Sequence, residues 1–201
     1  MSQVAAPGQR SAVEASRVGL RVPSLALLDA YADAMRARWS PNNSRDVTGE
    51  YLARIEQDPG EFIAWLLRPG EMIRLADGAE VQRLPDRLRW IVALDQPGEP
   101  LIGTIGLRWQ DGTAELPEHV LGHVGYTLLP VHRGRGYATE ALALILDEAR
   151  DVGLSQVEIV CDHDNHLSRR VIEKNGGVLT ETFVNPRYGD EPHLRFVIGL
   201  E

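Results

Sequence analysis

The feature that most constrains the fold is the segment VHRGRGYATE, residues 131–140. It joins an apolar, strand-like segment (123–129) to a strongly apolar helical pattern (138–152). A turn between a strand and a helix start collects free backbone N–H groups and the positive end of the helix dipole, which favours binding of a phosphate. Two glycines permit close approach of the backbone and two arginines add positive charge: Gly134, Gly136, Arg133 and Arg135. A plain turn that needs glycine only to change direction is the alternative interpretation.

Two common phosphate-binding motifs are absent from this segment. The dinucleotide motif GxGxxG requires a third glycine, and Thr139 occupies that position. The P-loop pattern GxxxxGK[ST] does not occur here either. The segment instead matches Arg-x-x-Gly-x-Ala, formed by Arg133, Gly136 and Ala138.

This match resembles the pyrophosphate-binding turn of the GNAT superfamily of acetyl-CoA-dependent N-acetyltransferases. The resemblance continues at Asn165-x-x-Ser168 and at EKNGG (173–177), and it covers roughly residues 101–182 but not the N-terminal third. It is closest to uncharacterised predicted acetyltransferases allied to the ribosomal-protein alanine acetyltransferases. It implies a single-domain α/β (α+β) GNAT fold over residues 18–201, with a mixed, mostly antiparallel twisted sheet flanked by helices.

The resemblance also implies acetyl-CoA as co-substrate and direct transfer of its acetyl group to a primary amine. Leu128 and Leu129 correspond to residues whose backbone contacts the thioester and the cofactor. Asn165 and Ser168 correspond to contacts with the pantetheine arm. The alternative is a capping pair, since asparagine is a favoured N-cap, and the two roles are compatible. The phosphate contacts are implied for Arg133, Gly134, Arg135, Gly136, Tyr137, Ala138 and Thr139.

His123 is the candidate catalytic base. It precedes Gly125 by two residues on the expected central strand, where related enzymes often carry a glutamate. Histidine titrates near neutrality, which suits removal of a proton from an amine. A structural strand residue is the competing interpretation. Glu118 and His119, on the preceding loop, are weaker candidates.

The general acid that many relatives use is missing. They place a tyrosine seven residues after the asparagine, and here that position is Ile172. Water, Cys161 and Tyr188 are possible substitutes, and a coenzyme A thiolate also leaves without one. The missing tyrosine favours a rival hypothesis, a non-catalytic acyl-CoA-binding or sensor module.

Composition limits the partners. The net charge of −8 argues against the second rival, an RNA-binding protein that uses the Arg133–Arg135 turn, and it suits a cationic amine. Neither an apolar run long enough for a membrane span nor a secretory signal is recognisable, so we expect a cytoplasmic protein. The histidines and acids of 161–166 fit no zinc or calcium spacing, and we expect no metal. An amino acid, polyamine, peptide N-terminus or antibiotic amine would fit as acceptor, and relatives are commonly homodimers.

Hydrophobic periodicity and turn residues predict the order of elements. Residues 1–17 have no clear period and are expected to form a flexible tail. Residues 69–86 are expected to be an irregular connector. Helices are expected at 25–39, 48–57, 61–67, 138–153 and 165–175, and strands at 18–22, 88–94, 101–109, 119–129, 156–161, 178–182 and 194–199.

Overall fold

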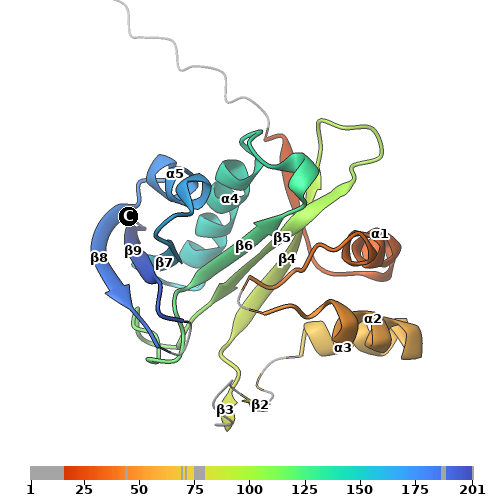
Figure 1. The fold of residues 1–201 in the computed structure, drawn as a ribbon, viewed down its shortest axis with the longest axis horizontal. Coiled ribbons are helices and arrows are strands. Elements are labelled where there is room, and N and C mark those ends of the chain that lie inside the picture. Colours follow the sequence, from red (N-terminus) through yellow and green to blue (C-terminus); the bar gives the residue numbers. More distant parts are fainter. Residues whose placement is uncertain are drawn as a thin grey trace, which may run out of the picture.

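The structure is a computed structural model that describes residues 16–43, 45–68, 70, 72–74, 80–186 and 189–200. Helices and strands combine in a mixed α/β fold (Figure 1). The helices are α1 (Leu25–Arg36), α2 (Thr48–Gln57), α3 (Pro59–Leu66), α4 (Tyr137–Asp151) and α5 (His166–Lys174). The strands are β1 (Val18–Arg21), β2 (Met72–Arg74), β3 (Glu80–Gln82), β4 (Asp86–Ala93), β5 (Leu101–Arg108), β6 (Val124–Leu128), β7 (Gln156–Asp162), β8 (Val178–Val184) and β9 (Pro192–Gly199).

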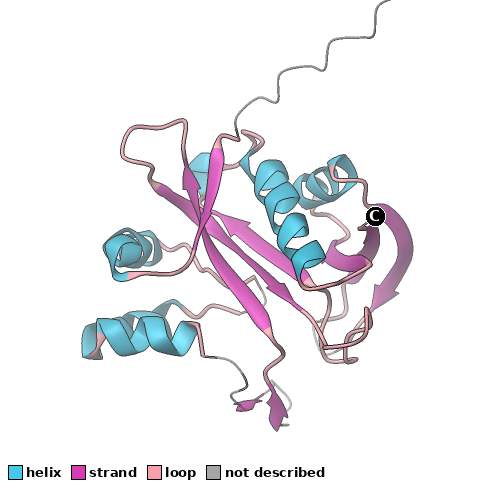
Figure 2. Ribbon diagram, turned by 180° about the vertical axis from the view of Figure 1, so that it is seen from behind, coloured by secondary structure: helices cyan, strands magenta, loops and turns pink. Residues whose placement is uncertain are grey.

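The first sheet has the strand order β1-β4-β5-β6, and every pair in it is antiparallel. Alternation along β4 divides its side chains between two hydrophobic clusters. Ile91 belongs to the cluster that packs on α4, whereas Trp90 belongs to the cluster formed by α1, α2 and α3. Helix α4 therefore covers one face of the sheet and α1–α3 cover the other, as the view from behind shows (Figure 2).

The second sheet has the order β7-β9-β8 and is also antiparallel. No ladder joins it to the first sheet among the described residues, although β6 and β7 are neighbours. The two sheets are tied at the start of β6, where the backbone N–H of His123 donates to the carbonyl of Glu158 at 2.8 Å. Beyond that point no strand pairs with this edge of β6 among the described residues. Two of its carbonyls accept side-chain donors instead, Tyr126 from Asn43 Nδ2 at 2.7 Å and Leu128 from Arg133 Nε at 3.0 Å. We call this region without strand pairing the split between the sheets.

Most predicted elements are confirmed to within three residues at their ends, and the differences have local causes. The central strand was expected from residue 119 but begins at Val124, because His123 directs its backbone bonds to both sheets. The 69–86 connector was wrong in part, since β2 and β3 form a short hairpin there. The tail prediction for 1–15 lies outside the described residues. Arg17, at the end of the expected tail, is bound to the domain, since its carbonyl accepts a hydrogen bond from the Leu94 N–H at 2.8 Å.

Candidate active site

The turn between β6 and α4 presents a row of backbone donors. Gly134 and Gly136 have φ values of +74° and +89°, a left-handed conformation that favours glycine. This path turns the chain into α4, whose first N–H groups have no acceptor within the helix. In the described part of the chain, no backbone acceptor faces the N–H groups of 134–136. The turn thus offers several N–H groups at the positive end of a helix longer than three turns.

Two arginines hold this turn in place. Arg133 donates from Nε to the carbonyl of Leu128 at 3.0 Å, which fixes the turn to the end of β6. Arg17 donates to the carbonyl of Arg135 at 3.1 Å and, from Nε, to Glu140 Oε1 at 2.8 Å. Its guanidinium lies under the turn, so that a Cβ at Gly136 would be 2.9 Å from Arg17 Nη2. The carboxylate in the first turn of α4 is therefore paired, while the exposed Arg135 side chain adds positive charge.

The other expected phosphate contacts divide between backbone and side chain. The Tyr137 side chain is buried, and its hydroxyl donates to Asp95 Oδ1 at 2.9 Å, which leaves only its backbone for a ligand. Ala138 offers a backbone N–H in the first helical turn. The Thr139 N–H bonds the Gly136 carbonyl at 3.0 Å, so its hydroxyl is the group with which it can bind.

The edge of β6 carries the second set of donors. Leu129 donates to Ile102 at 2.9 Å and Arg108 donates to His123 at 2.9 Å, which fixes the alternation between β5 and β6. In an antiparallel pair the intervening residues, Tyr126 and Leu128, point both backbone groups away from the partner strand. Leu128 therefore has an N–H in the split, whereas the N–H of Leu129 is occupied. Of the two leucines expected to contact the co-substrate through the backbone, only Leu128 therefore has an N–H that is available to a ligand.

His123 links the two sheets through hydrogen bonds of its backbone and its ring to Glu158, and we call this link the tie. Its side chain is 0 % exposed, and its Nδ1 accepts the backbone N–H of Glu158 at 3.0 Å. Nε2 has no partner among the described residues. Burial, and then the positive charge of Arg108, lower the pKa of His123 to about 4. A neutral imidazole that accepts at Nδ1 carries its proton on Nε2, which leaves no lone pair for an amine proton. Of the two interpretations that the sequence left open, the structure favours the structural one.

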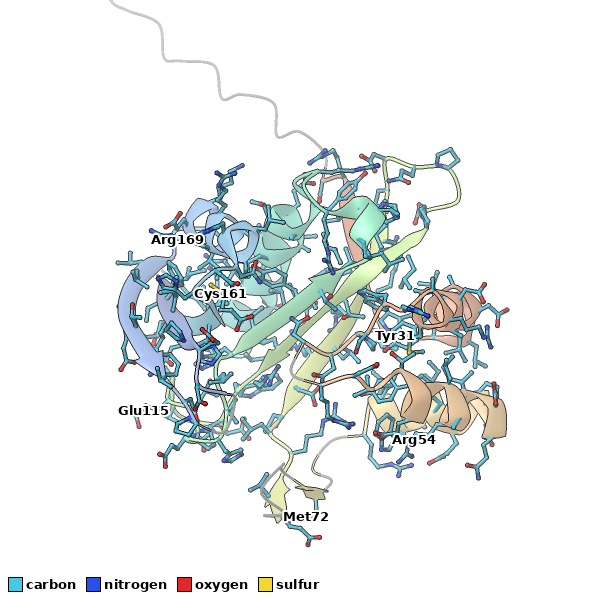
Figure 3. All side chains as sticks on the ribbon, in the orientation of Figure 1. Tyr31, Arg54, Met72, Glu115, Cys161 and Arg169 are labelled. Carbon is cyan, nitrogen blue, oxygen red and sulfur yellow. The ribbon has the colours of Figure 1, made fainter. Side chains whose placement is uncertain are left out.

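Three polar side chains meet across the split, beneath α5. Asn165 caps this helix by accepting the Ser168 N–H at 3.0 Å. The Ser168 hydroxyl lies 2.8 Å from the Tyr126 hydroxyl, which projects from β6. Cys161, on β7, is buried under the same helix (Figure 3), and burial raises the pKa of its thiol to about 11. The sequence analysis overlooked Tyr126, although it shares a face and an edge of the strand with Leu128.

Comparison with known proteins identifies the family. The model of the acetyltransferase (GNAT) domain matches residues 17–178. The chain belongs to the GNAT acetyltransferase family. No curated protein matches the chain significantly. The fold is similar to a GNAT-family acetyltransferase from Bacillus anthracis, at 20% identity with 93% and 97% of the two chains covered and a TM-score of 0.57.

Two further solved structures share the fold. RimL, the ribosomal L7/L12 α-N-protein acetyltransferase, is 16% identical with a TM-score of 0.60, covering 92% of this chain and 96% of that one. That structure is a complex in which coenzyme A is disulfide-bonded to a cysteine. The microcin C7 self-immunity acetyltransferase MccE, in complex with acetyl-CoA and AMP, is 14% identical with a TM-score of 0.56, covering 92% and 93%.

The GNAT assignment makes the chain an acyltransferase. Ile172 occupies the position at which the resemblance implied a tyrosine. Ile172 is 0 % exposed, in the core that α4 and α5 share. A Cβ at Gly177 would lie 2.4 Å from its Cγ2. The side chain at this position is therefore tightly packed in the core, and being aliphatic it offers no polar contact to a leaving sulfur.

The remaining candidate sites carry no comparable chemistry. A cavity of about 280 Å³ lies near the C-terminal end of α4, lined by residues 110, 112–114 and 152–155, and none of these is charged. In the described ranges, no group of three or more His, Cys, Asp or Glu side chains is arranged to hold a metal ion. No described helix is long and apolar enough to span a membrane. The two weaker candidates for the catalytic base lie on the loop before β6, where Glu118 is exposed and His119 is half-buried.

Proposed function

We propose that this GNAT enzyme transfers the acetyl group of acetyl-CoA directly to a primary amine of a small molecule or peptide. The observation that carries the proposal is the free N–H of Leu128 in the split, at the end of the strand that leads into the donor-rich turn. One strand and its turn thus offer a donor for a thioester oxygen and a group of donors for a pyrophosphate. A plain strand-to-helix turn needs neither.

The chemistry of the donors fits coenzyme A. A pyrophosphate bound to the N–H groups of 134–138 would receive hydrogen bonds from backbone that has no other acceptor, and Arg135 would offset its charge. The pantetheine arm would run along the edge of β6 toward Tyr126 and Leu128, with Asn165 and Ser168 facing it from α5. The co-substrate supplies an activated acetyl group, and the chain supplies position and hydrogen bonds.

The Leu128 N–H supports the acyl-transfer step. As the amine adds to the thioester carbon, negative charge develops on the carbonyl oxygen. A fixed donor at such an oxygen contributes about 2.7–4 kcal/mol to catalysis. Because the donor belongs to the backbone, its position depends on the tie at His123 and on the sheet, not on a side-chain rotamer.

The test of cofactor binding is thermal unfolding with acetyl-CoA, with ATP and NAD as controls. At 100 times the dissociation constant, a ligand of the native state adds about 2.7 kcal/mol, which corresponds to an increase in Tm of about 5–10 °C for a chain of this size. An increase with acetyl-CoA alone supports the proposal. Equal increases with ATP would indicate a generic phosphate site and contradict it.

The test of turnover is a panel of amines, with release of the coenzyme A thiol as the readout. The panel begins with α-amines, because at pH 7 their deprotonation costs about 1 kcal/mol, against about 4.6 kcal/mol for a lysine-like amine. Thiol release that depends on the amine supports acetyl transfer. Binding of acetyl-CoA without turnover on any amine would instead indicate the acyl-CoA-binding module.

A further inference from the structure

The Tyr126–Ser168 pair lies near the Leu128 N–H to which the proposed function assigns the thioester oxygen. Tyr126 lies on β6 two residues before Leu128. The two side chains therefore lie on the same face of the sheet, and the backbone groups of both residues point toward the split. Its hydroxyl reaches Ser168 in the first turn of α5, at 2.8 Å from Oγ and 3.4 Å from the carbonyl oxygen. The pair therefore bridges the split on the face covered by α5, adjacent to the thioester donor.

We propose that Tyr126 is a catalytic residue whose phenol O–H donates a hydrogen bond to the sulfur of coenzyme A as the thioester breaks, with Ser168 as the positioning residue. This role rests on the proposed function. It replaces the contact that Ile172 cannot make from α5, and it does so from the opposite side of the split.

The electron and proton balance defines the step. The amine nitrogen forms a bond to the carbonyl carbon, and the C–S bond then breaks with its electron pair on sulfur. The sulfur leaves as a thiolate that accepts the hydrogen bond from Tyr126, while the extra proton on nitrogen passes to water. The phenol keeps its proton throughout.

The environment of the phenol suits a donor that stays protonated. Burial raises the pKa of Tyr126 to about 12, and the hydrogen bond with Ser168 acts in the opposite direction. A thiol ionises near pH 8.5, so complete transfer of the phenol proton to the thiolate is unfavourable, whereas a hydrogen bond to the negative charge is favourable. Cys161 cannot replace the phenol in this role, because its sulfur is a weak donor.

Ser168 fixes the direction of the phenol. The cap from Asn165 holds the Ser168 backbone at 3.0 Å, and α5 is anchored in turn by Asn175, whose side chain donates to the Thr139 carbonyl at 3.1 Å. The Ser168 hydroxyl can donate to the phenol oxygen at 2.8 Å, and the phenol O–H donates to the Ser168 carbonyl only at 3.4 Å. A ligand sulfur in the split would take the place of that long bond. Toward the leaving sulfur, the serine thus acts through the tyrosine.

The test measures ionisation of the bound product and needs no acceptor. Coenzyme A is bound to the enzyme, and thiolate absorbance, corrected for enzyme alone, is followed against pH. In the wild type the thiol of bound coenzyme A should ionise at a lower pKa than in free coenzyme A. The substitution Tyr126→Phe should raise this pKa by about one to two units, the usual worth of a hydrogen bond to a charged group. Ser168→Ala should give a smaller rise.

A matched control is Tyr51→Phe. Tyr51 lies on α2 against the rings of Phe62 and Trp65, and no hydrogen bond of its hydroxyl is found in the described structure. This variant should keep the wild-type titration. Once an amine acceptor is identified, Tyr126→Phe should lower kcat about 10- to 100-fold with little change in KM for acetyl-CoA.

The outcomes separate the two proposals. If the wild type does not bind coenzyme A, the proposed function fails. If Tyr126→Phe binds coenzyme A and its thiol titrates as in the wild type, the role of Tyr126 is refuted while the function stands. If Tyr126→Phe does not fold or does not bind coenzyme A, the titration of the wild type is the deciding measurement. A thiol pKa in bound coenzyme A that is equal to or higher than the pKa in free coenzyme A would refute the role of Tyr126.

Discussion

From the buried tie at His123 we predict how the free energy of unfolding depends on pH. His123 has a folded-state pKa of about 4, whereas an unfolded histidine titrates near 6.5. Between these values the unfolded chain binds a proton and the folded chain does not. The contribution of His123 to stability is therefore complete above pH 6.5 and is lost as the pH falls toward 4, by about 3 kcal/mol in total. Between pH 7 and pH 5 the loss is about 2 kcal/mol.

The substitution that isolates the pH-dependent contribution of His123 to stability is His123→Asn. An asparagine side chain can place its amide oxygen near the position of Nδ1 and accept the Glu158 N–H, but it does not titrate. Urea unfolding at pH 7 and pH 5 gives the free energy of unfolding of each variant. The wild type should lose about 2 kcal/mol more than His123→Asn over this interval. His163→Asn, at an exposed position, is the matched control and should behave as the wild type.

Equal losses in the wild type and in His123→Asn would refute the reasoning, because they would mean that His123 titrates alike in the folded and unfolded chains. The absolute stability of the variant does not enter this comparison. A lower stability at pH 7 is expected from imperfect packing around the smaller side chain, and only the difference between the two pH values tests the tie.

Three further substitutions test the turn, the tie and the second helix. Gly136→Ala, at φ +89° and with Arg17 Nη2 at 2.9 Å from the new Cβ, should weaken acetyl-CoA binding in calorimetry, whereas unchanged affinity would argue against the turn as the phosphate site. Gly122→Ala would place its Cβ 2.9 Å from the Glu158 carbonyl and should cost about 1–3 kcal/mol in urea unfolding; a neutral effect would mean that the sheets separate freely there. Asn165→Ala removes the cap of α5 and should cost about 1 kcal/mol, while Asn165→Asp, which can still accept, should cost less.

The parts of the fold that the sequence predicts well are those with a local cause. Helical spacing of apolar residues placed α4, and glycine marked both of its ends: Gly136 at the start and Gly153, at φ +82°, just after the last turn. The donor-rich turn could likewise be predicted. Gly134 and Gly136 permit the left-handed backbone of the turn, and Arg133 and Arg135 give it positive charge. The short hairpin of β2 and β3 was missed because three-residue strands carry no readable period.

The site was harder to predict because its main donor is a backbone group. Whether the Leu128 N–H is free depends on which neighbour β6 pairs with, and no side chain records that choice. The role of His123 was open for the same reason: an imidazole has the same sequence signature whether it faces a substrate or the backbone of β7. Tyr126 could have been found from the sequence, since alternation puts it on the same face as Leu128, but its partner Ser168 lies 42 residues away in the chain.

The tie and the split depend on each other. If β6 and β7 paired along their whole length, the N–H of Leu128 would be consumed in a ladder and Tyr126 would have no space to meet Ser168. If they did not meet at all, the distance between Leu128 on one sheet and Cys161 on the other would depend only on packing through the core that they share with α4. His123, which bonds β7 through both its backbone and its ring, ends the pairing at one point and orients everything beyond it. If the proposed function holds, we therefore expect His123→Asn to shift the pKa of the bound coenzyme A thiol, because the variant weakens the link that positions Leu128 and Tyr126 although His123 itself does not touch the thiol.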